Sequence, residues 1–255
     1  METCSSPLLA CAAMLTHANQ HHPPIILIHG AANSATVWTI WQQELATRGW
    51  STFALDLRGH GSSPPVDLVD VRMADYAEDV QRLVQQLTMA PVLLGWSMGG
   101  LVALMVAASG GIAACVTLAP SIPARHEDPA VPLRSGIMMA SVYGITSTDP
   151  ADQPVMPDLT LAERRIALAS LSLESQRARD ERQRGIVIET LPCPLLIVTG
   201  SEDTLWPRTR YADLWLQADQ LQMDGASHWG LVLNRQAITA ALPRIVGWLA
   251  RMLRP

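Results

Sequence analysis

The sequence contains no lysine, and all 18 of its basic residues are arginines. This absence excludes every mechanism that needs a lysine Schiff base or a lysine ammonium group. No part of the chain concentrates arginine without acidic residues among them, and the net charge is −5. A nucleic-acid or anionic-membrane surface needs the opposite pattern. We therefore expect small-molecule partners, with no nucleic acid and no membrane.

Cysteine is scarce and long apolar runs are missing. Cys4, Cys11, Cys115 and Cys193 form no C-x-x-C pair, which is typical of reduced packing residues rather than of a disulfide framework. No apolar stretch approaches the ~20 residues that span a bilayer. The short apolar run that ends at Cys11 has no basic residue before it, unlike a signal peptide. We predict a cytoplasmic protein of unknown oligomeric state.

Short apolar segments alternate with segments of helical periodicity along most of the 255 residues. The strand-like segments are residues 24–29, 51–57, 91–95, 114–119, 194–200 and 220–223, with a weaker one at 8–15. The helix-like segments are residues 37–48, 74–87, 98–109, 207–216 and 236–253. This order predicts an α/β fold with a mostly parallel sheet and helices on both faces.

Residues 121–191 interrupt the alternation. They are rich in proline, carry a methionine-rich patch, and show a charged helical pattern over residues 161–184. About 70 residues are too many for an ordinary connection between two strands. We predict a core of residues 1–120 and 192–255, with residues 121–191 inserted as a lid or small helical cap.

The sequence Gly95-Trp96-Ser97-Met98-Gly99 matches the G-x-S-x-G pattern of a nucleophile elbow. It directly follows a predicted strand and opens a predicted helix, which is the context that this turn requires. Glycines at 95 and 99 fit, because side chains there collide where the backbone turns tightly. A glycine-rich turn with an incidental serine is the alternative. We predict that Ser97 is a nucleophile.

A serine hydroxyl needs a base to take its proton and a third group to orient that base. His228 lies just after the last predicted strand, and Asp203 follows the strand at 194–200. Together with Ser97 they give the chain order serine, acid, histidine of α/β-hydrolases. Glu202 is the competing acid, and we favour Asp203 because the nearby Pro207 fixes the loop against the segment that follows.

A developing oxyanion needs two preorganised hydrogen-bond donors. The backbone N–H of Met98, next to the nucleophile, is one candidate, and that of Ala31, in the loop after a predicted strand, is the other. Gly30 lets this loop approach the nucleophile. His29 is expected to orient the loop rather than to titrate in catalysis.

Two further patterns carry less weight. Residues 56–61 (DLRGHG) match neither glycine-rich phosphate-binding motif, so a structural turn is favoured, with Arg58 available for local pairing. His17, His21 and His22 lack a second cluster of ligands at a recognisable spacing. We predict no metal and no cofactor.

Residues 121–191 are expected to determine the substrate. The predicted acyl-binding residues there form a flexible apolar surface, although core packing is the commoner role of such a patch; they are Met138, Met139, Val142 and Tyr143. Trp96 and Trp229 flank predicted catalytic residues and either wall the acyl site or pack in the core. The arginines at 164–184 are interspersed with acids, so an ion-paired solvated face is favoured over a dock for an acidic carrier protein or a carboxylate.

Five segments together resemble the capped α/β-hydrolases: HGAANSATVW at 29–38, DLRGHG at 56–61, GWSMGGLVAL at 95–104, GSEDTLWP at 200–207 and GASHWG at 225–230. The turn GWSMGGLVA is also similar to that of bacterial esterases that cleave methyl esters of carrier-protein-bound pimeloyl groups, which implies an acyl carrier protein as a partner. The segment 121–191 shows no comparable match.

The resemblance implies that Ser97 attacks an acyl carbonyl, that His228 takes its proton, and that Asp203 orients the imidazole. An acyl ester or thioester is the expected substrate. A C–C bond hydrolase, a cofactor-free perhydrolase or haloperoxidase, and a ligand-binding protein with a vestigial triad are the alternatives. Serine in place of aspartate at 97 disfavours epoxide hydrolases and haloalkane dehalogenases, and the absence of lysine disfavours lysine-dependent hydroxynitrile lyases.

Overall fold

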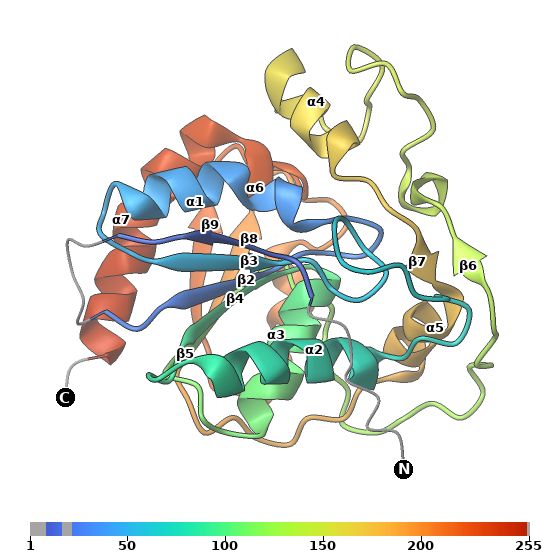
Figure 1. Cartoon of the computed structure of the whole chain (residues 1–255), viewed down its shortest axis with the longest axis horizontal. Helices are drawn as coiled ribbons and strands as arrows, with labels where there is room; N and C mark the ends of the chain where they lie inside the picture. Colours follow the sequence, from blue (N-terminus) through green and yellow to red (C-terminus); the bar gives the residue numbers. More distant parts are fainter. Residues whose placement is uncertain (1–8, 17–21, 254–255) are drawn as a thin grey trace.

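A computed structural model describes residues 9–16 and 22–253, and its main feature is a seven-stranded sheet with helices on both faces (Figure 1). The strands are β1 (Cys11–Met14), β2 (Ile25–Ile28), β3 (Thr52–Leu55), β4 (Val92–Trp96), β5 (Ala114–Leu118), β8 (Leu195–Gly200) and β9 (Asp219–Met223). Their order in the sheet is β1-β3-β2-β4-β5-β8-β9. β1 pairs antiparallel with β3, and the other pairs are parallel. The predicted α/β fold class is confirmed.

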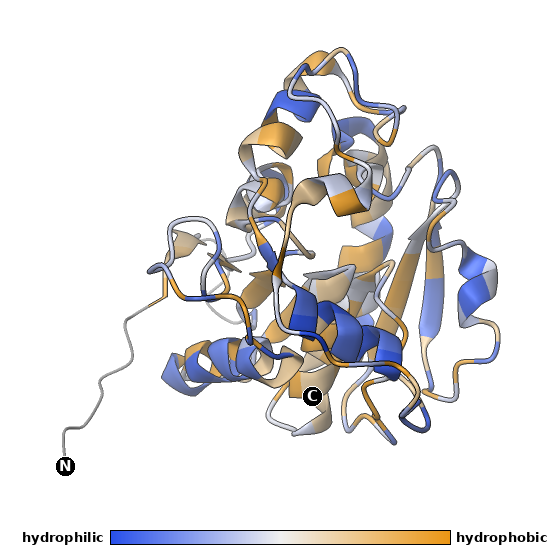
Figure 2. Cartoon of the chain, turned by 90° about the vertical axis from the view of Figure 1, so that its right-hand side faces the viewer, coloured by the Kyte–Doolittle hydropathy of each residue, from blue (hydrophilic) through white to orange (hydrophobic). Residues whose placement is uncertain are grey.

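The helices cover the two faces of this sheet. They are α1 (Thr39–Ala46), α6 (Gly230–Leu233) and α7 (Arg235–Met252) on one face, and α2 (Met73–Gln86) and α3 (Met98–Ala108) on the other (Figure 1). A short 3-10 helix, η1 (Ala35–Trp38), precedes α1. Figure 2 shows hydrophobic residues on the central strands and hydrophilic residues on the outer helices.

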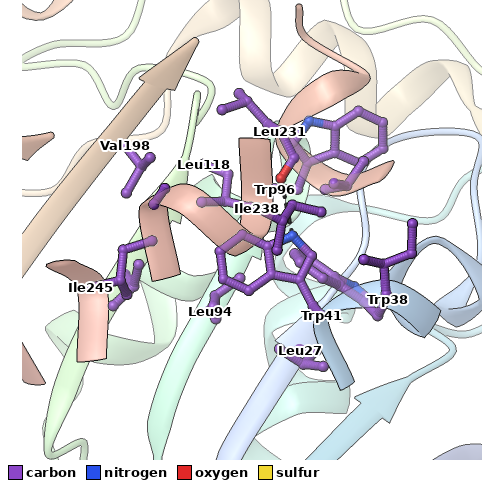
Figure 3. Packing of buried hydrophobic residues seen from close by; sticks show 14 of the residues in the cluster. Leu27, Trp38, Trp41, Leu94, Trp96, Leu118, Val198, Leu231, Ile238 and Ile245 are labelled. Carbon is purple, nitrogen blue, oxygen red and sulfur yellow. Dashed lines mark hydrogen bonds between the residues drawn. The ribbon is translucent and has the colours of Figure 1, made fainter. Parts of the chain in front are cut away.

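Alternate residues of each central strand belong to different hydrophobic cores. In β2, Ile25 and Leu27 pack in the core below α1, α6 and α7, whereas Ile26 and Ile28 pack against α2 and α3. Strands buried on both faces appear as unbroken apolar runs in the sequence, which is why they were recognisable. In the first core, the indole N–H of Trp41 donates a hydrogen bond of 3.0 Å to the carbonyl of Leu231 (Figure 3).

The segment between β5 and β8 lies outside the main sheet, on the right in Figure 1. We call residues 121–191 the inserted segment. It holds β6 (Ile137–Met138), η2 (Ala140–Tyr143), α4 (Leu161–Ala169), β7 (Glu174–Ser175) and α5 (Gln176–Arg184). β6 and β7 form a separate antiparallel pair. The helical pattern predicted over 161–184 is therefore two helices, because Glu174 and Ser175 form a buried strand between them.

The helix predicted at 207–216 is wrong: only a 3-10 turn, η3 (Arg208–Tyr211), forms there. Long-range contacts explain the difference, since the Tyr211 hydroxyl donates to the carbonyl of Pro120 and the Trp215 indole N–H to that of Ile188. The weak strand predicted at 8–15 is present as β1. Of the described cysteines, Cys115 is buried and Cys11 is exposed, and Cys4 lies outside the described residues.

Candidate active site

Ser97 sits at a strained turn between β4 and α3. Its φ is 55° and its ψ is −116°, a backbone conformation that non-glycine residues rarely adopt and that tends to occur at functional sites. The turn fits because residues 95 and 99, two positions to either side of Ser97, are glycines. A Cβ on Gly95 would collide with the carbonyl of Gly99, and a Cβ on Gly99 with the carbonyls of β2 and of His29. The Ser97 N–H donates to the carbonyl of Leu118 at 2.9 Å and fixes the turn to β5.

His228 and Asp203 meet at the carboxyl end of the sheet. The Nδ1 of His228 lies 2.7 Å from Oδ2 of Asp203, and Oδ1 of Asp203 accepts the N–H groups of Leu205 and Trp206 at 3.0 and 2.9 Å. Burial alone would raise the pKa of Asp203, but the bond to His228 and these N–H donors outweigh it and lower that pKa. The competing acid, Glu202, is exposed to solvent.

A cavity of about 700 Å³ opens beside Ser97 and His228, and both residues line it. Four of the predicted substrate-binding residues also line it, namely Trp96, Trp229, Val142 and Tyr143. The indole N–H of Trp96 donates to the carbonyl of His228 at 3.1 Å, so Trp96 also holds the histidine loop.

The two predicted methionines do not line this cavity. Met138 is buried in β6 opposite Glu174, and Met139 is 65% exposed. The hydrophobic pattern of the sequence does not separate a residue that packs inside the inserted segment from one that faces the cavity.

The loop Ala31–Asn33, which carries one predicted oxyanion donor, lies at the cavity wall. Ala32 has a positive φ of 55°. The inserted segment holds both backbone groups of Ala32: its N–H donates to Oε2 of Glu174 at 3.1 Å, and its carbonyl accepts from the N–H of Ser172 at 2.9 Å. Met98, the other predicted donor, begins α3 directly after Ser97, and its side chain packs in the core.

Glu174 is the centre of a buried polar cluster that joins the inserted segment to the core. Its Oε1 accepts the Tyr76 hydroxyl at 2.6 Å, and its Oε2 lies 3.6 Å from Nε2 of His60. Burial raises the pKa of Glu174, but His60, the charge of Arg182 and the Tyr76 hydroxyl outweigh it and lower that pKa to about 2. Burial opposes the charge on His60, and Glu174 reverses this and raises the pKa of His60.

The model of the alpha/beta hydrolase family matches residues 25–241, which include Ser97, Asp203 and His228. The chain belongs to the alpha/beta hydrolase family. It is therefore a hydrolase. The pimeloyl-[acyl-carrier protein] methyl ester esterase of Klebsiella pneumoniae is 28% identical over 252 residues, covering 86% of this hydrolase and 91% of the relative.

Solved structures share the fold of the hydrolase. The monoacylglycerol lipase of Paleococcus ferrophilus has a TM-score of 0.65 at 20% identity, covering 96% of the hydrolase and 99% of the lipase. Polyneuridine aldehyde esterase has a TM-score of 0.69 at 17% identity, covering 88% and 99% of the two chains. At these identities the likeness concerns the fold alone.

His29 of the hydrolase has the orienting place expected of it. Its Nδ1 lies 2.8 Å from the carbonyl of Gly30, and its Nε2 accepts the N–H of Leu57 at 3.2 Å. Burial, reinforced by the charge of His60, lowers the pKa of His29 to about 3, so the ring is neutral. Arg58 pairs with Asp79 at 2.7 Å, which fits a structural turn at 56–61.

Residues 9–16 and 22–253 hold no group of three or more potential metal ligands, and none of their helices combines the length and apolar character of a membrane span. His22 stacks on Trp50 with ring centroids 4.3 Å apart. His17 and His21 lie outside the described residues.

Sequence reasoning missed several residues of the hydrolase's cavity and its wall. Glu174 has no sequence pattern that marks it, because it sits at a break in a helical pattern. Arg179 and Arg182 line the cavity, whereas the acidic residues among the arginines of this segment predict an ion-paired solvated face. Their helical spacing from one another was visible, but which face of the helix meets the cavity depends on the fold.

Proposed function

We propose that this protein is a serine hydrolase that cleaves a carboxylic ester or thioester through an acyl-enzyme on Ser97. The observation that carries the proposal is the 2.7 Å contact between His228 and Asp203 beside a cavity that Ser97 and His228 both line. The strained backbone of Ser97 adds to it, because this conformation projects the nucleophile from a strand-to-helix turn.

In the proposed mechanism, His228 takes the proton of the Ser97 hydroxyl as the oxygen attacks the acyl carbonyl. Asp203 keeps the proton of the imidazole on Nδ1 and stabilises the imidazolium that forms. The backbone N–H groups of Ala31 and Met98 donate hydrogen bonds to the carbonyl oxygen and stabilise its negative charge. His228 then gives its proton to the departing alkoxide or thiolate, and water activated by His228 releases the acid and restores Ser97.

The inserted segment is proposed to act as a cap over a core of residues 1–120 and 192–255. Trp96, Trp229, Val142 and Tyr143 are proposed to contact the acyl group, since each lines the cavity. The Klebsiella relative acts, by its name, on a methyl ester of a carrier-bound acyl group. A methyl ester, with an acyl carrier protein as a partner, is accordingly one proposed substrate.

Turnover of a panel of acyl esters and thioesters tests the proposal. We expect release of an acid together with an alcohol or a thiol, and loss of this activity in Ser97→Ala. Release of a ketone would identify a C–C bond hydrolase, and a product formed only with peroxide would identify a perhydrolase. Unchanged turnover in Ser97→Ala refutes the proposed nucleophile.

A further inference from the structure

Helix α5 presents two different faces to its surroundings. Arg179, Arg182 and Gln183 are spaced three and four residues apart, on one side of the helix, and all three line the cavity beside Ser97. The other charged residues of α5 have ion-pair partners, in the pairs Arg177–Glu181, Arg72–Glu181, Arg134–Asp180 and Arg184–Glu127.

The cavity-facing arginines lack such partners. Among the described residues, neither Arg179 nor Arg182 lies within 4.0 Å of a carboxylate oxygen. Within the part of the chain that the structure describes, the side chain of Arg182 donates one hydrogen bond, from Nη2 to the Tyr143 hydroxyl at 3.1 Å, and its buried Nε has no partner. Both arginines are half-buried, so water screens their charges less than those of exposed residues.

The rest of the cavity lining does not neutralise these charges. Among the described residues that form it, there is no aspartate or glutamate, and there is a third arginine, Arg210, which lies over the Trp206 ring at 5.0 Å. Glu174 is close enough for Arg182 to lower its pKa, but its oxygens already accept from Tyr76, Ser175 and Ala32 and face His60. The cavity wall therefore carries an excess of positive charge.

We propose that Arg179 and Arg182 bind an anionic group, a carboxylate or a phosphate, on the substrate whose ester or thioester is cleaved at Ser97. Guanidinium groups suit this role because their planar array of N–H donors matches the oxygens of both anions. The inference rests on the proposed function and narrows its substrate to esters and thioesters that carry a negative charge at a point away from the scissile bond.

Two matched pairs of substrates test this inference. Methyl hexanoate and monomethyl adipate differ by one carboxylate, and hexanoyl-pantetheine and hexanoyl-phosphopantetheine differ by one phosphate. We expect the anionic member of at least one pair to have the higher kcat/KM with the wild-type protein. The pair that shows the preference identifies the anion.

Arg179→Gln and Arg182→Gln are expected to lower kcat/KM for that anionic substrate by about 10- to 100-fold, as removal of a charged hydrogen-bond donor does. They should lower kcat/KM for the neutral member much less, and turnover of that member shows that each variant is folded. Arg177→Gln is the matched control, because it removes the same charge from the ion-paired face of α5. Arg177→Gln should leave kcat/KM unchanged for both members of the pair.

Three results overturn the inference. The first is that the wild type hydrolyses both members of each pair equally. The second is that Arg182→Gln and Arg179→Gln slow the hydrolysis of both members equally. The third is that hydrolysis requires an acidic carrier protein and depends on Arg177, which would place the anion on the outer face of α5.

Failure of the proposed function would look different, because no ester or thioester would then be hydrolysed. In that case calorimetric titration of Ser97→Ala with monomethyl adipate, methyl hexanoate and both pantetheine thioesters decides the inference. Tighter binding of an anionic member supports it, and equal binding within both pairs overturns it.

Discussion

Glu174 and Arg182 come from the same inserted segment, yet their surroundings differ. Both oxygens of Glu174 accept hydrogen bonds, and its side chain is fully buried. Arg182 is half-buried and donates to one hydroxyl. A polar group whose bonding capacity is used within the protein stabilises one arrangement, whereas one with capacity left can bind a ligand. Glu174 thus positions the loop at Ala32, and Arg182 faces the substrate.

The largest expected loss of activity is that of Asp203→Asn, with which the effects of changing Glu174 and Arg182 can be compared. Asp203→Asn should reduce kcat by about ten-thousandfold, because an amide favours the wrong imidazole tautomer, as in other Ser-His-Asp enzymes. Steady-state rates with methyl hexanoate and monomethyl adipate measure it. The loss should be equal for both substrates, and Glu202→Gln is the matched control with unchanged rates.

Glu174→Gln tests the fully bonded side of the comparison. The amide retains the shape of the carboxylate but loses the negative charge that attracts the N–H of Ala32, so the loop Ala31–Asn33 is held less firmly. We expect kcat to fall by about 10- to 100-fold, less than for complete loss of an oxyanion donor, with neutral and anionic esters affected equally.

A urea titration of the same variant separates positioning from stability. We expect the free energy of unfolding to fall by about 1–3 kcal/mol, the cost of a weakened bond to a charged group. A loss of stability with kcat unchanged would make Glu174 a purely structural residue. Tyr76→Phe, which removes a single donor to the same carboxylate, should give smaller changes of both kinds.

The pair Glu174–His60 also predicts a pH dependence. The pKa of His60 is raised from 6.5, so its contribution to stability is complete below pH 6.5 and is lost as pH rises through the raised value. The pKa of Glu174 is lowered from 4.5 to about 2, so its contribution is complete above pH 4.5 and is lost as pH falls toward 2. The Tm difference between wild type and Glu174→Gln should therefore be largest between pH 4.5 and 6.5.

Thermal unfolding of both proteins across this range measures the difference. The Tm difference between wild type and His60→Gln should likewise become smaller as pH rises above 6.5. A Tm difference that does not vary with pH would show that the two groups do not interact as a charged pair.

The smallest effect is expected for Arg177→Gln. Its pair with Glu181 is 3.5 Å long and partly exposed, and such pairs contribute about 0–1 kcal/mol. Urea unfolding should show a change within that range, with kcat/KM unaltered for every substrate. A lower kcat/KM for anionic substrates alone would show that the ion-paired face of α5 also binds the anion, and would contradict the distinction between its two faces.

Local steric requirements made the sharp turn at Ser97 predictable. Gly95 and Gly99 are needed because a Cβ at either position would collide with the backbone. The steric requirement of the turn is therefore visible in the sequence close to Ser97. The central strands were recognisable for a similar reason, since burial on both faces demands a continuous apolar run. The contact between Asp203 and His228 could be predicted because chain order in a parallel sheet determines which loops meet.

Tertiary contacts decided what the sequence left open. Glu174 forms its bonds with residues about 100 positions or more away, apart from the one to Ser175. The segment at 207–216 has helical spacing but is held by distant carbonyls. Arg177 and Glu181 pair within α5 at a spacing of four residues, whereas only the placement of α5 brings Arg182 to the cavity. The predicted cytoplasmic location stays a prediction.

The central claim is that Ser97 is an activated nucleophile, and labelling with a fluorophosphonate tests it most directly. The reagent is incubated with the wild type, Ser97→Ala and Asp203→Asn, and the adduct is located by peptide mass spectrometry. We predict one adduct, on Ser97, formed rapidly in the wild type, slowly in Asp203→Asn and not at all in Ser97→Ala. An unlabelled Ser97, or equal labelling of Ser97→Ala at another residue, would contradict the account.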